Sequence, residues 1–286
     1  MARGNKDIAA TRRDLISELT DLFPGNEAVS IARMVLDHVG YSEYTILKNP
    51  SAEPEQQIRS EITKIVNELQ KNRPIQYILG QTRFFDLPFY VDERVLIPRP
   101  ETEELVSQVL QESNSTSPRI LDIGTGSGCI AITLAHYIPN SKTDAIDIEP
   151  GTIEVARKNA ARNNAAVNFY RANILELADD PGDVQYDLIV SNPPYVTQTD
   201  QLMMHPRVTK NEPGTALFVS DADPLVFYRA IAKYGLYALA KGGAVWVEIN
   251  ELFGKETTAL FMEAGFKNPR LMKDIHGKDR FIKAEI

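Results

Sequence analysis

The sequence Ser-Asn-Pro-Pro-Tyr at residues 191–195, here called the ledge, has residue types that suit chemistry on an amino group. It follows the apolar run 186–190, which is typical of a buried strand. The two prolines remove two backbone donors and fix two φ angles, so the chain leaves the strand as a stiff segment. The side-chain carbonyl of Asn192 and the backbone carbonyl of Pro193 can then accept the two N–H bonds of a planar –NH2 group, while the Tyr195 ring packs on it.

Positioning is the contribution that such a ledge makes to catalysis. Amide and aryl amines are poor nucleophiles because the nitrogen lone pair is delocalised, so fixing the N–H bonds and aiming the nitrogen at an electrophile is what remains for the protein to do. We therefore predict that Asn192, Pro193 and Tyr195 are catalytic. The alternative is an ordinary strand-to-loop turn with a Pro-Pro stop, and the neighbouring motifs favour the first interpretation.

A glycine-rich loop earlier in the chain indicates a cofactor site. The sequence Leu-Asp-Ile-Gly-Thr-Gly-Ser-Gly at 121–128 lies between a predicted strand and a predicted helix. Its glycines allow a sharp turn and close approach of a ligand to a helix N-terminus. The spacing is GxGxG, whereas dinucleotide-binding proteins prefer GxGxxG. The predicted cofactor-binding residues of this loop are Gly124, Thr125, Gly126, Ser127 and Gly128.

Polar residues after the next two predicted strands extend this site. Asp147 ends the second strand, where a carboxylate can accept hydrogen bonds from both hydroxyls of a ribose. Asn173 follows the third strand, where an adenine would lie. Because ligands of open α/β sheets bind at the carboxyl ends of the strands, these loops and the ledge are expected to share one crevice. We predict that Asp147, Asn173 and Asn192 contact the cofactor.

The elements that would position these residues define an α/β protein. From residue 119 onward strands alternate with helices, which predicts a mostly parallel sheet covered on both faces. The last two strands are too close in sequence for a crossover helix and are expected to form an antiparallel hairpin. The predicted strands are 119–123, 143–148, 167–170, 186–190, 244–249, 270–274 and 280–284.

The first part of the chain has a different pattern. Residues 1–75 show helical periodicity, and short alternating apolar runs from Ile75 to Asp92 predict a β-hairpin. The predicted organisation is a small all-helical domain at 1–75 for substrate recognition, a β-hairpin and linker at 76–100, and the catalytic α/β domain at 101–286.

Arg99 is a candidate for the rim of the active site. It lies between Pro98 and Pro100, which hold it in extended geometry, and acidic residues just after Pro100 suit the first turn of a helix that ends near Ser113. A charged side chain on so stiff a lead-in is an unusual choice for a plain linker.

Composition limits the alternatives. The chain has 286 residues, 43% hydrophobic and 24% charged, with a net charge of −8, which disfavours a broad phosphate-binding surface. It shows no membrane-length apolar segment and no signal peptide at its start, so a cytoplasmic protein is expected. One cysteine and four scattered histidines argue against a metal site. The cysteine, Cys129, is interpreted as a packed residue.

The glycine loop, the ribose acid and the ledge, in this order, resemble the class I S-adenosylmethionine-dependent methyltransferases, and among them the amino-methyltransferases with an Asn/Asp/Ser-Pro-Pro-Tyr/Phe motif. The whole chain further resembles the release-factor glutamine methyltransferase (HemK/PrmC) family. Pro-Arg-Pro-Glu-Thr-Glu at 98–103 together with the ledge carries most of this resemblance. The other matching segments are 73–80, 84–85, 95–97, 122–128, 212–217, 242–249 and 273–280.

The resemblance implies a Rossmann-like seven-stranded methyltransferase domain and a substrate. That substrate is the glutamine of the Gly-Gly-Gln motif in class I peptide-chain release factors, methylated on its side-chain amide nitrogen with S-adenosyl-L-methionine. Asn192 and Pro193 would hold the amide, Tyr195 would pack on it, Pro194 would stiffen the ledge, and Arg99 would contact the substrate. The nitrogen would attack the sulfonium methyl directly and S-adenosyl-L-homocysteine would leave, with no metal; no general base is evident.

Two residues depart from the family pattern: Asn211 where an aromatic residue often precedes Glu-Pro, and Asn173 where the residue near the adenine is often acidic. The main alternative function is methylation of the N6 amine of adenine or another amine of a nucleic acid. A catalytically silent module that binds release factors or ribosomes is a third possibility. We expect a monomer that makes no direct contact with nucleic acid or membrane.

Overall fold

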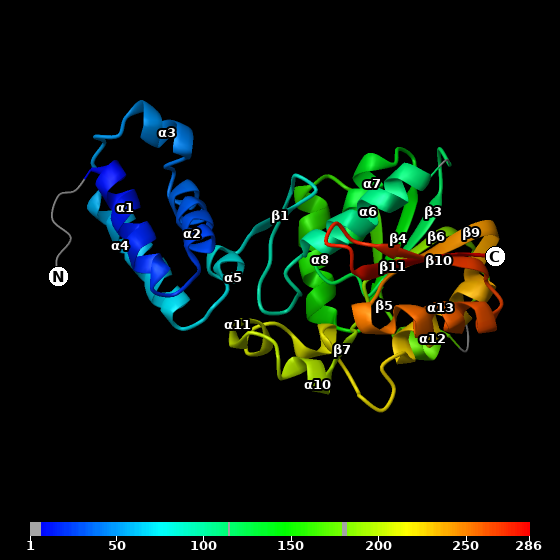
Figure 1. The fold of residues 1–286 in the computed structure, drawn as a ribbon. Helices are drawn as coiled ribbons and strands as arrows, with labels where there is room; N and C mark the ends of the chain where they lie inside the picture. Colours follow the sequence, from blue (N-terminus) through cyan, green and yellow to red (C-terminus); the bar gives the residue numbers. More distant parts are fainter. Residues whose placement is uncertain (1–6, 114, 179–181) are drawn as a thin grey trace. The chain divides into compact units, whose positions relative to one another are not determined.

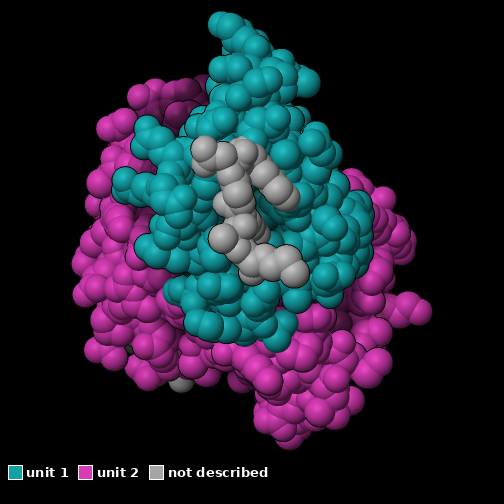
Figure 2. Space-filling model, turned by 90° about the vertical axis from the view of Figure 1, so that its left-hand side faces the viewer, with its two compact units in different colours: residues 1–80 teal, residues 81–286 magenta. Residues whose placement is uncertain are grey.

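The computed structural model describes residues 7–113, 115–178 and 182–286. These residues form two compact units, 1–80 and 81–286, which Figure 2 colours teal and magenta. None of the helices in the described part of the chain is long and apolar enough to cross a membrane. Each unit has a hydrophobic core of its own.

The first unit is a small helical bundle. Its helices are α1 (Ile8–Thr20), α2 (Gly25–His38), α3 (Glu43–Lys48), α4 (Gln56–Gln70) and α5 (Ile75–Leu79). Helix α1 is capped by Asp7, whose carboxylate accepts a hydrogen bond of 2.7 Å from the backbone N–H of Ala10. The apolar faces of α1, α2 and α4 meet in a core that includes Leu15, Val35 and Ile62, all buried. The helical character expected for 1–75 is therefore present in residues 7–75, and residues 1–6 lie outside the described part of the chain.

Helix α5 corrects one boundary of the sequence analysis. The β-hairpin was expected to begin at Ile75, but residues 75–79 form a helix that starts after Pro74 and ends at Gly80. Gly80 has a φ of 64°, a left-handed conformation that glycine adopts without cost and that ends a helix. The hairpin itself is shorter than expected and consists of β1 (Thr82–Phe84) and β2 (Leu87–Phe89).

The second unit is built on a seven-stranded sheet with the order β10-β11-β9-β6-β3-β4-β5. The strands are β3 (Arg119–Ile123), β4 (Lys142–Asp147), β5 (Val167–Arg171), β6 (Tyr186–Ser191), β9 (Leu239–Glu248), β10 (Lys267–Lys273) and β11 (Asp279–Glu285). The five strands from β9 to β5 are parallel, and β11 pairs antiparallel with both β9 and β10. The predicted α/β fold, with seven strands and a terminal antiparallel hairpin, is confirmed.

Helices cover both faces of this sheet (Figure 1). One face carries α6 (Pro100–Glu112), α7 (Cys129–Tyr137) and α8 (Pro150–Arg162), and the other carries α9 (Ile174–Leu177), α12 (Val226–Ala238) and α13 (Gly254–Ala264). The side chains of a strand alternate between the two cores, as a pleated strand requires: Val190 packs on the α6–α8 side and Ile189 on the α12–α13 side. A central strand that is buried on both faces is rich in apolar residues, which is why β6, with Leu188, Ile189 and Val190 in a row, was recognisable in the sequence.

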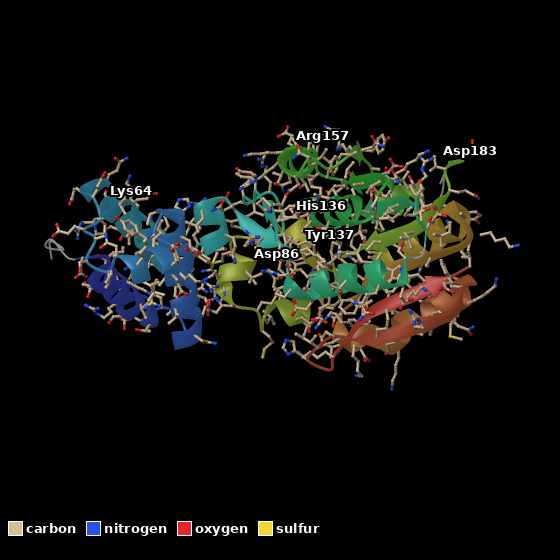
Figure 3. All side chains as sticks on the ribbon, turned by 90° about the horizontal axis from the view of Figure 1, so that it is seen from above. Lys64, Asp86, His136, Tyr137, Arg157 and Asp183 are labelled. Atoms are coloured by element: carbon tan, nitrogen blue, oxygen red, sulfur yellow. The ribbon has the colours of Figure 1, made fainter. Side chains whose placement is uncertain are left out.

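The β1–β2 hairpin packs on the end of α7. The ring of Tyr137 lies 5.5 Å from the ring of Phe85, and its hydroxyl donates a 3.3 Å hydrogen bond to the Phe85 carbonyl. Figure 3 shows Tyr137 near Asp86, the other residue of the hairpin turn. Phe84 and Phe89, both buried, extend the core on this side of the sheet. The hairpin is thus a part of the α/β unit.

Between β6 and α12 the chain makes an excursion that the sequence analysis left unassigned. It contains β7 (Val196–Thr197), α10 (Gln198–Gln201), α11 (Pro206–Thr209), the 3-10 helix η1 (Gly214–Ala216) and β8 (Phe218–Val219). Strands β7 and β8 pair parallel to each other over two residues, so the excursion leaves and returns at the same place. A second 3-10 helix, η2 (Glu251–Phe253), joins β9 to α13.

Candidate active site

A cavity of about 380 Å³ lies at the carboxyl ends of the parallel strands. The chain runs from β3 outward to β4 and β5 and then returns to β6 on the other side of β3, so the sheet has its switch point between β3 and β6. Open α/β sheets bind ligands at this point. The cavity walls include the glycine loop, Asp147, Asn173, Arg99 and the ledge residues Asn192, Pro193 and Pro194. The structure therefore brings together the residues predicted for cofactor and substrate, with the exceptions of Gly128 and Tyr195, which do not line the cavity.

The glycine loop has the backbone conformation that its sequence requires. Gly124, Gly126 and Gly128 have φ values of 71°, 55° and 83°, a region that strongly favours glycine. At Gly128 an added Cβ would lie 2.8 Å from the Cδ1 of Ile132 and 3.3 Å from the Cβ of Ala156. The third glycine is therefore needed for close packing of the loop on α7 and α8, and the first two leave space at the cavity wall.

Asp147 is held at the end of β4 by the backbone. Its Oδ2 accepts a hydrogen bond of 3.0 Å from the N–H of Gly126, and its Oδ1 accepts one of 3.1 Å from the N–H of Glu149. Each carboxylate oxygen can accept a further hydrogen bond, so both remain able to bind a diol. Burial raises the pKa of Asp147, which these two N–H donors oppose. The residue is fixed in place before any ligand arrives.

Asp122 is the buried acid behind the glycine loop. Its Oδ2 accepts hydrogen bonds from the Thr125 hydroxyl at 2.7 Å and from the N–H of Ala131 at 3.2 Å. Its Oδ1 has no hydrogen-bond partner among the described residues. Burial raises the pKa of Asp122 to about 7, and the nearby Asp147 adds to the effect. The residue ties the loop to the first turn of α7 at a cost in desolvation.

The raised pKa of Asp122 predicts how stability depends on pH. Its ordinary value is 3.8, so between about pH 4 and pH 7 the unfolded chain has released a proton that the folded chain still holds. The contribution of this residue to stability is complete at low pH and is lost as the pH rises through 7. We expect the free energy of unfolding of wild type, measured by thermal unfolding, to fall by about 2 kcal/mol more between pH 5 and pH 7 than that of Asp122→Asn. An equal pH response of the two proteins would contradict the assignment, since every other titrating group is common to both.

The ledge presents two oxygen atoms without partners. The Nδ2 of Asn192 donates a 2.9 Å hydrogen bond to the Oγ1 of Thr102, so the amide has one defined orientation. Within the described part of the chain, neither the Oδ1 of Asn192 nor the carbonyl of Pro193 has a hydrogen-bond partner, and both residues line the cavity. Ser191, just before them, donates to the carbonyl of Ile123 at 2.7 Å and ties the ledge to β3. Two free acceptors on a rigid support suit an –NH2 group.

Tyr195 is placed behind the ledge. Its hydroxyl donates a 2.9 Å hydrogen bond to Oε1 of Glu248, its carbonyl accepts one of 3.1 Å from Nδ2 of Asn250, and its ring packs with the core on the α12–α13 side. It is not among the described residues that line the cavity. Burial and the neighbouring Glu248 raise the pKa of Tyr195 well above its usual range, so it remains a phenol. Direct packing of Tyr195 on a substrate stays a prediction.

Arg99 lines the cavity and forms an ion pair with Glu212, which lies behind it. The guanidinium donates a 2.6 Å hydrogen bond to Oε1 of Glu212, whose side chain is 2% exposed, and Oε2 of the same carboxylate accepts one of 3.3 Å from the N–H of Ile97. Pro98 and Pro213, adjacent to the two ends of this ion pair, both line the cavity. Arg99 therefore anchors the two-proline segment to the excursion after β6, and its remaining N–H groups are available at the rim.

Two further residues have local roles. Asn173 caps α9: its Oδ1 accepts from the N–H of Leu175 and its Nδ2 donates to Glu176, both at 3.0 Å. It reaches the cavity, beside the apolar side chain of Leu175. Cys129 is buried, and burial raises the pKa of its thiol to about 12. Such a thiol is not a nucleophile, in agreement with its interpretation as a packed residue.

Sequence reasoning missed Thr102, Glu212 and Glu248. Each lies in a segment that contributed to the family resemblance, but no spacing pattern indicated its partner. The hydrogen bond between Arg99 and Glu212 spans 113 positions of the sequence, and the one between Thr102 and Glu248 spans 146. The signal that was present is the residue type: an acidic residue inside the apolar run 244–249 must find hydrogen-bond donors.

This arrangement of sheet, switch-point cavity and glycine loop is that of a methyltransferase. Residues 101–211 match the model of the methyltransferase small domain family. Among solved structures, a methyltransferase from Pyrococcus furiosus has a similar fold, with a TM-score of 0.51 and 18% identity over 78% of this chain and 98% of that one. A Thermus thermophilus 16S rRNA N2 G1207 methyltransferase also has a TM-score of 0.51, at 17% identity over 72% of this chain and 49% of that one.

Curated relatives give the family. A release factor glutamine methyltransferase from Bacteroides thetaiotaomicron is 42% identical over 93% of this chain and 95% of its own length. One from Flavobacterium psychrophilum is 48% identical over 77% of this chain and 78% of its own length. The chain belongs to the release factor glutamine methyltransferase family, and the resemblance inferred from its motifs is confirmed.

Proposed function

We propose that this protein transfers the methyl group of S-adenosyl-L-methionine to the side-chain amide nitrogen of the glutamine in the Gly-Gly-Gln motif of class I peptide-chain release factors. The observation that carries the proposal is the pair of free acceptors, Oδ1 of Asn192 and the carbonyl of Pro193, at the cavity that also contains the glycine loop and Asp147. A primary amide has two N–H donors in one plane, which matches two acceptors on one rigid segment.

The cofactor side of the cavity suits S-adenosyl-L-methionine. We propose that Gly124 to Gly128 contact its methionine part, that Asp147 accepts its ribose hydroxyls, and that Asn173 lies near its adenine. Ile148 and Leu175, both partly exposed at the cavity, offer apolar surface for a purine. When bound, the cofactor supplies an electrophilic methyl group on a sulfonium, so the protein has no need to activate a leaving group.

The contribution of the ledge is to orient the nucleophile. By accepting both N–H bonds, Asn192 and Pro193 would fix the plane of the glutamine amide and increase the electron density on its nitrogen. Pro194 stiffens this segment, and Arg99 would hold the substrate at the rim. Of the described residues that line the cavity, Asp147 and Glu149 are the only carboxylates, and both lie on the cofactor side. The amide proton would therefore leave to water once methylation has raised the positive charge on nitrogen.

The direct test is a methyl-transfer assay with labelled S-adenosyl-L-methionine and a purified class I release factor, followed by peptide mass mapping. We expect one methyl group on the Gly-Gly-Gln glutamine, and no transfer when that glutamine is changed. A control reaction contains DNA and RNA oligonucleotides in place of the release factor. Transfer to oligonucleotides without transfer to the protein would contradict the proposal and would show that the substrate is an amine of a nucleobase.

The remaining proposals concern partners and location. We propose that residues 1–75 contribute to recognition of the release factor, and that the enzyme acts as a cytoplasmic monomer without direct contact to nucleic acid. The net charge of −8 supports the last point, because binding to phosphate backbones depends on excess positive charge.

A further inference from the structure

We propose that Thr102 and Glu248 are positioning residues that set which end of the Asn192 amide is offered to the substrate. The inference rests on the proposed function of Asn192, and it assigns a task to two residues outside the predicted site. Thr102 comes from the first turn of α6 and Glu248 from the end of β9, so they reach the ledge from elements far apart in the sequence.

A chain of hydrogen bonds connects the three side chains. The Nδ2 of Asn192 donates to Oγ1 of Thr102 at 2.9 Å, and the Thr102 hydroxyl donates to Oε2 of Glu248 at 2.7 Å. The other oxygen of Glu248 accepts the Tyr195 hydroxyl at 2.9 Å. Thr102 is 3% exposed and Glu248 is 1% exposed, so solvent offers neither side chain an alternative partner. Both are fully engaged by the ledge.

The direction in which these hydrogen bonds are donated has a chemical consequence. Burial raises the pKa of Glu248, and the hydrogen bonds that its two oxygens accept from the Thr102 and Tyr195 hydroxyls oppose this shift and favour the carboxylate. A carboxylate accepts hydrogen bonds and donates none, so the Thr102 hydroxyl gives its proton to Glu248. The oxygen of Thr102 then has only lone pairs to offer Asn192, which turns the –NH2 end of the amide toward Thr102 and leaves the carbonyl end for the ligand. A reversed amide would present N–H groups to the N–H groups of the substrate. Glu248 thus ensures, through Thr102, that Asn192 acts as an acceptor.

Two substitutions at Thr102 test this role. Thr102→Val keeps the shape but removes the hydroxyl, and we expect kcat for release-factor methylation to fall about 10- to 100-fold. The dissociation constant of S-adenosyl-L-methionine, measured by calorimetry, should stay unchanged. Thr102→Ser retains the hydroxyl and should restore kcat to within a few-fold of wild type. A matched control is Thr257→Val, which removes another buried hydroxyl, one without a partner among the described residues, from α13.

Glu248→Gln tests the direction of the hydrogen bonds from Asn192 through Thr102 to Glu248. The amide of glutamine can donate to Thr102, which allows the Thr102 hydroxyl to donate to Asn192 and the Asn192 amide to reverse. We expect kcat to fall about tenfold with an unchanged cofactor dissociation constant. A Glu248→Gln variant with the kcat of wild type would remove Glu248 from the proposal.

A double-mutant cycle separates positioning from a direct or a structural role. If Thr102 acts through Asn192, Thr102→Val should have no further effect on kcat in an Asn192→Ala background. Independent effects that multiply would overturn the proposal. Thermal unfolding of each variant identifies loss of fold. The proposed function and the present inference fail in different ways. If wild-type protein transfers no methyl group to the release factor, the proposed function is wrong. If wild type is active and Thr102→Val is equally active, the present inference is wrong.

Discussion

Replacement of Asn192 by alanine is expected to lower turnover by about two to three orders of magnitude while leaving cofactor affinity intact. The magnitude is that of removing one pre-positioned hydrogen-bonding group from an active site. The change removes the Oδ1 acceptor from the cavity wall and leaves the glycine loop and Asp147 untouched. The measurement is kcat in the release-factor assay together with the dissociation constant of S-adenosyl-L-methionine by calorimetry.

The matched control for this variant is Asn168→Ala. Asn168 lies on β5, the edge strand of the sheet, and its Nδ2 donates to Asp144 at 2.9 Å, so the same chemical change is made outside the cavity. Its kcat should stay near that of wild type. If Asn192→Ala loses cofactor affinity and turnover to the same extent, Asn192 holds the cofactor or the fold, and the ledge does not act on the substrate amide.

Replacement of Asp147 by asparagine should have the opposite profile. The carboxylate oxygens of Asp147 accept from two backbone N–H groups and can each accept one more hydrogen bond, whereas asparagine substitutes a donor for one of them. A charge-assisted hydrogen bond contributes about 1.5–3 kcal/mol, so the dissociation constant of S-adenosyl-L-methionine should rise about 10- to 150-fold. Turnover at saturating cofactor should fall much less.

Asp183→Asn provides the comparison, because Asp183 is exposed, does not line the cavity and precedes β6 at the opposite end of that strand from the ledge. Calorimetry should give it the cofactor affinity of wild type. Unchanged affinity in Asp147→Asn would exclude the ribose from contact with this carboxylate, and the assignment of the β4 loop to the cofactor would be withdrawn.

Periodicity and turn residues were sufficient to predict the α/β unit. The strand before the ledge is rich in apolar residues because both faces of β6 pack on a core, and the glycine loop needs glycine because its φ values are positive. Such properties depend on single segments, so they can be inferred from a short stretch of sequence. Helix α5 was missed because five residues between Pro74 and Gly80 are too few to show a helical period.

The parts that could not be predicted depend on partners remote in sequence. Tyr195 resembles a residue that would pack on the substrate, yet its hydroxyl binds Glu248 from the end of β9. The acidic residues Glu212 and Glu248 gave no sign of their partners, because hydrogen bonds between loops follow from the sheet order and not from spacing. The excursion after β6 was unassigned, since its helices and strands are only two to four residues long.

The position of β9 next to β6 has a consequence for synthesis of the chain. The ledge follows β6, but the strand that pairs with β6 on its outer side, and that carries Glu248, leaves the ribosome only after the excursion and α12. Until then β6 is an exposed apolar edge, the kind of strand that pairs with other chains. A nascent chain that ends before β9 thus combines a complete glycine loop with an unsupported ledge. Chaperone dependence and aggregation are expected to be greatest in this interval of translation, and to disappear once β9 is added.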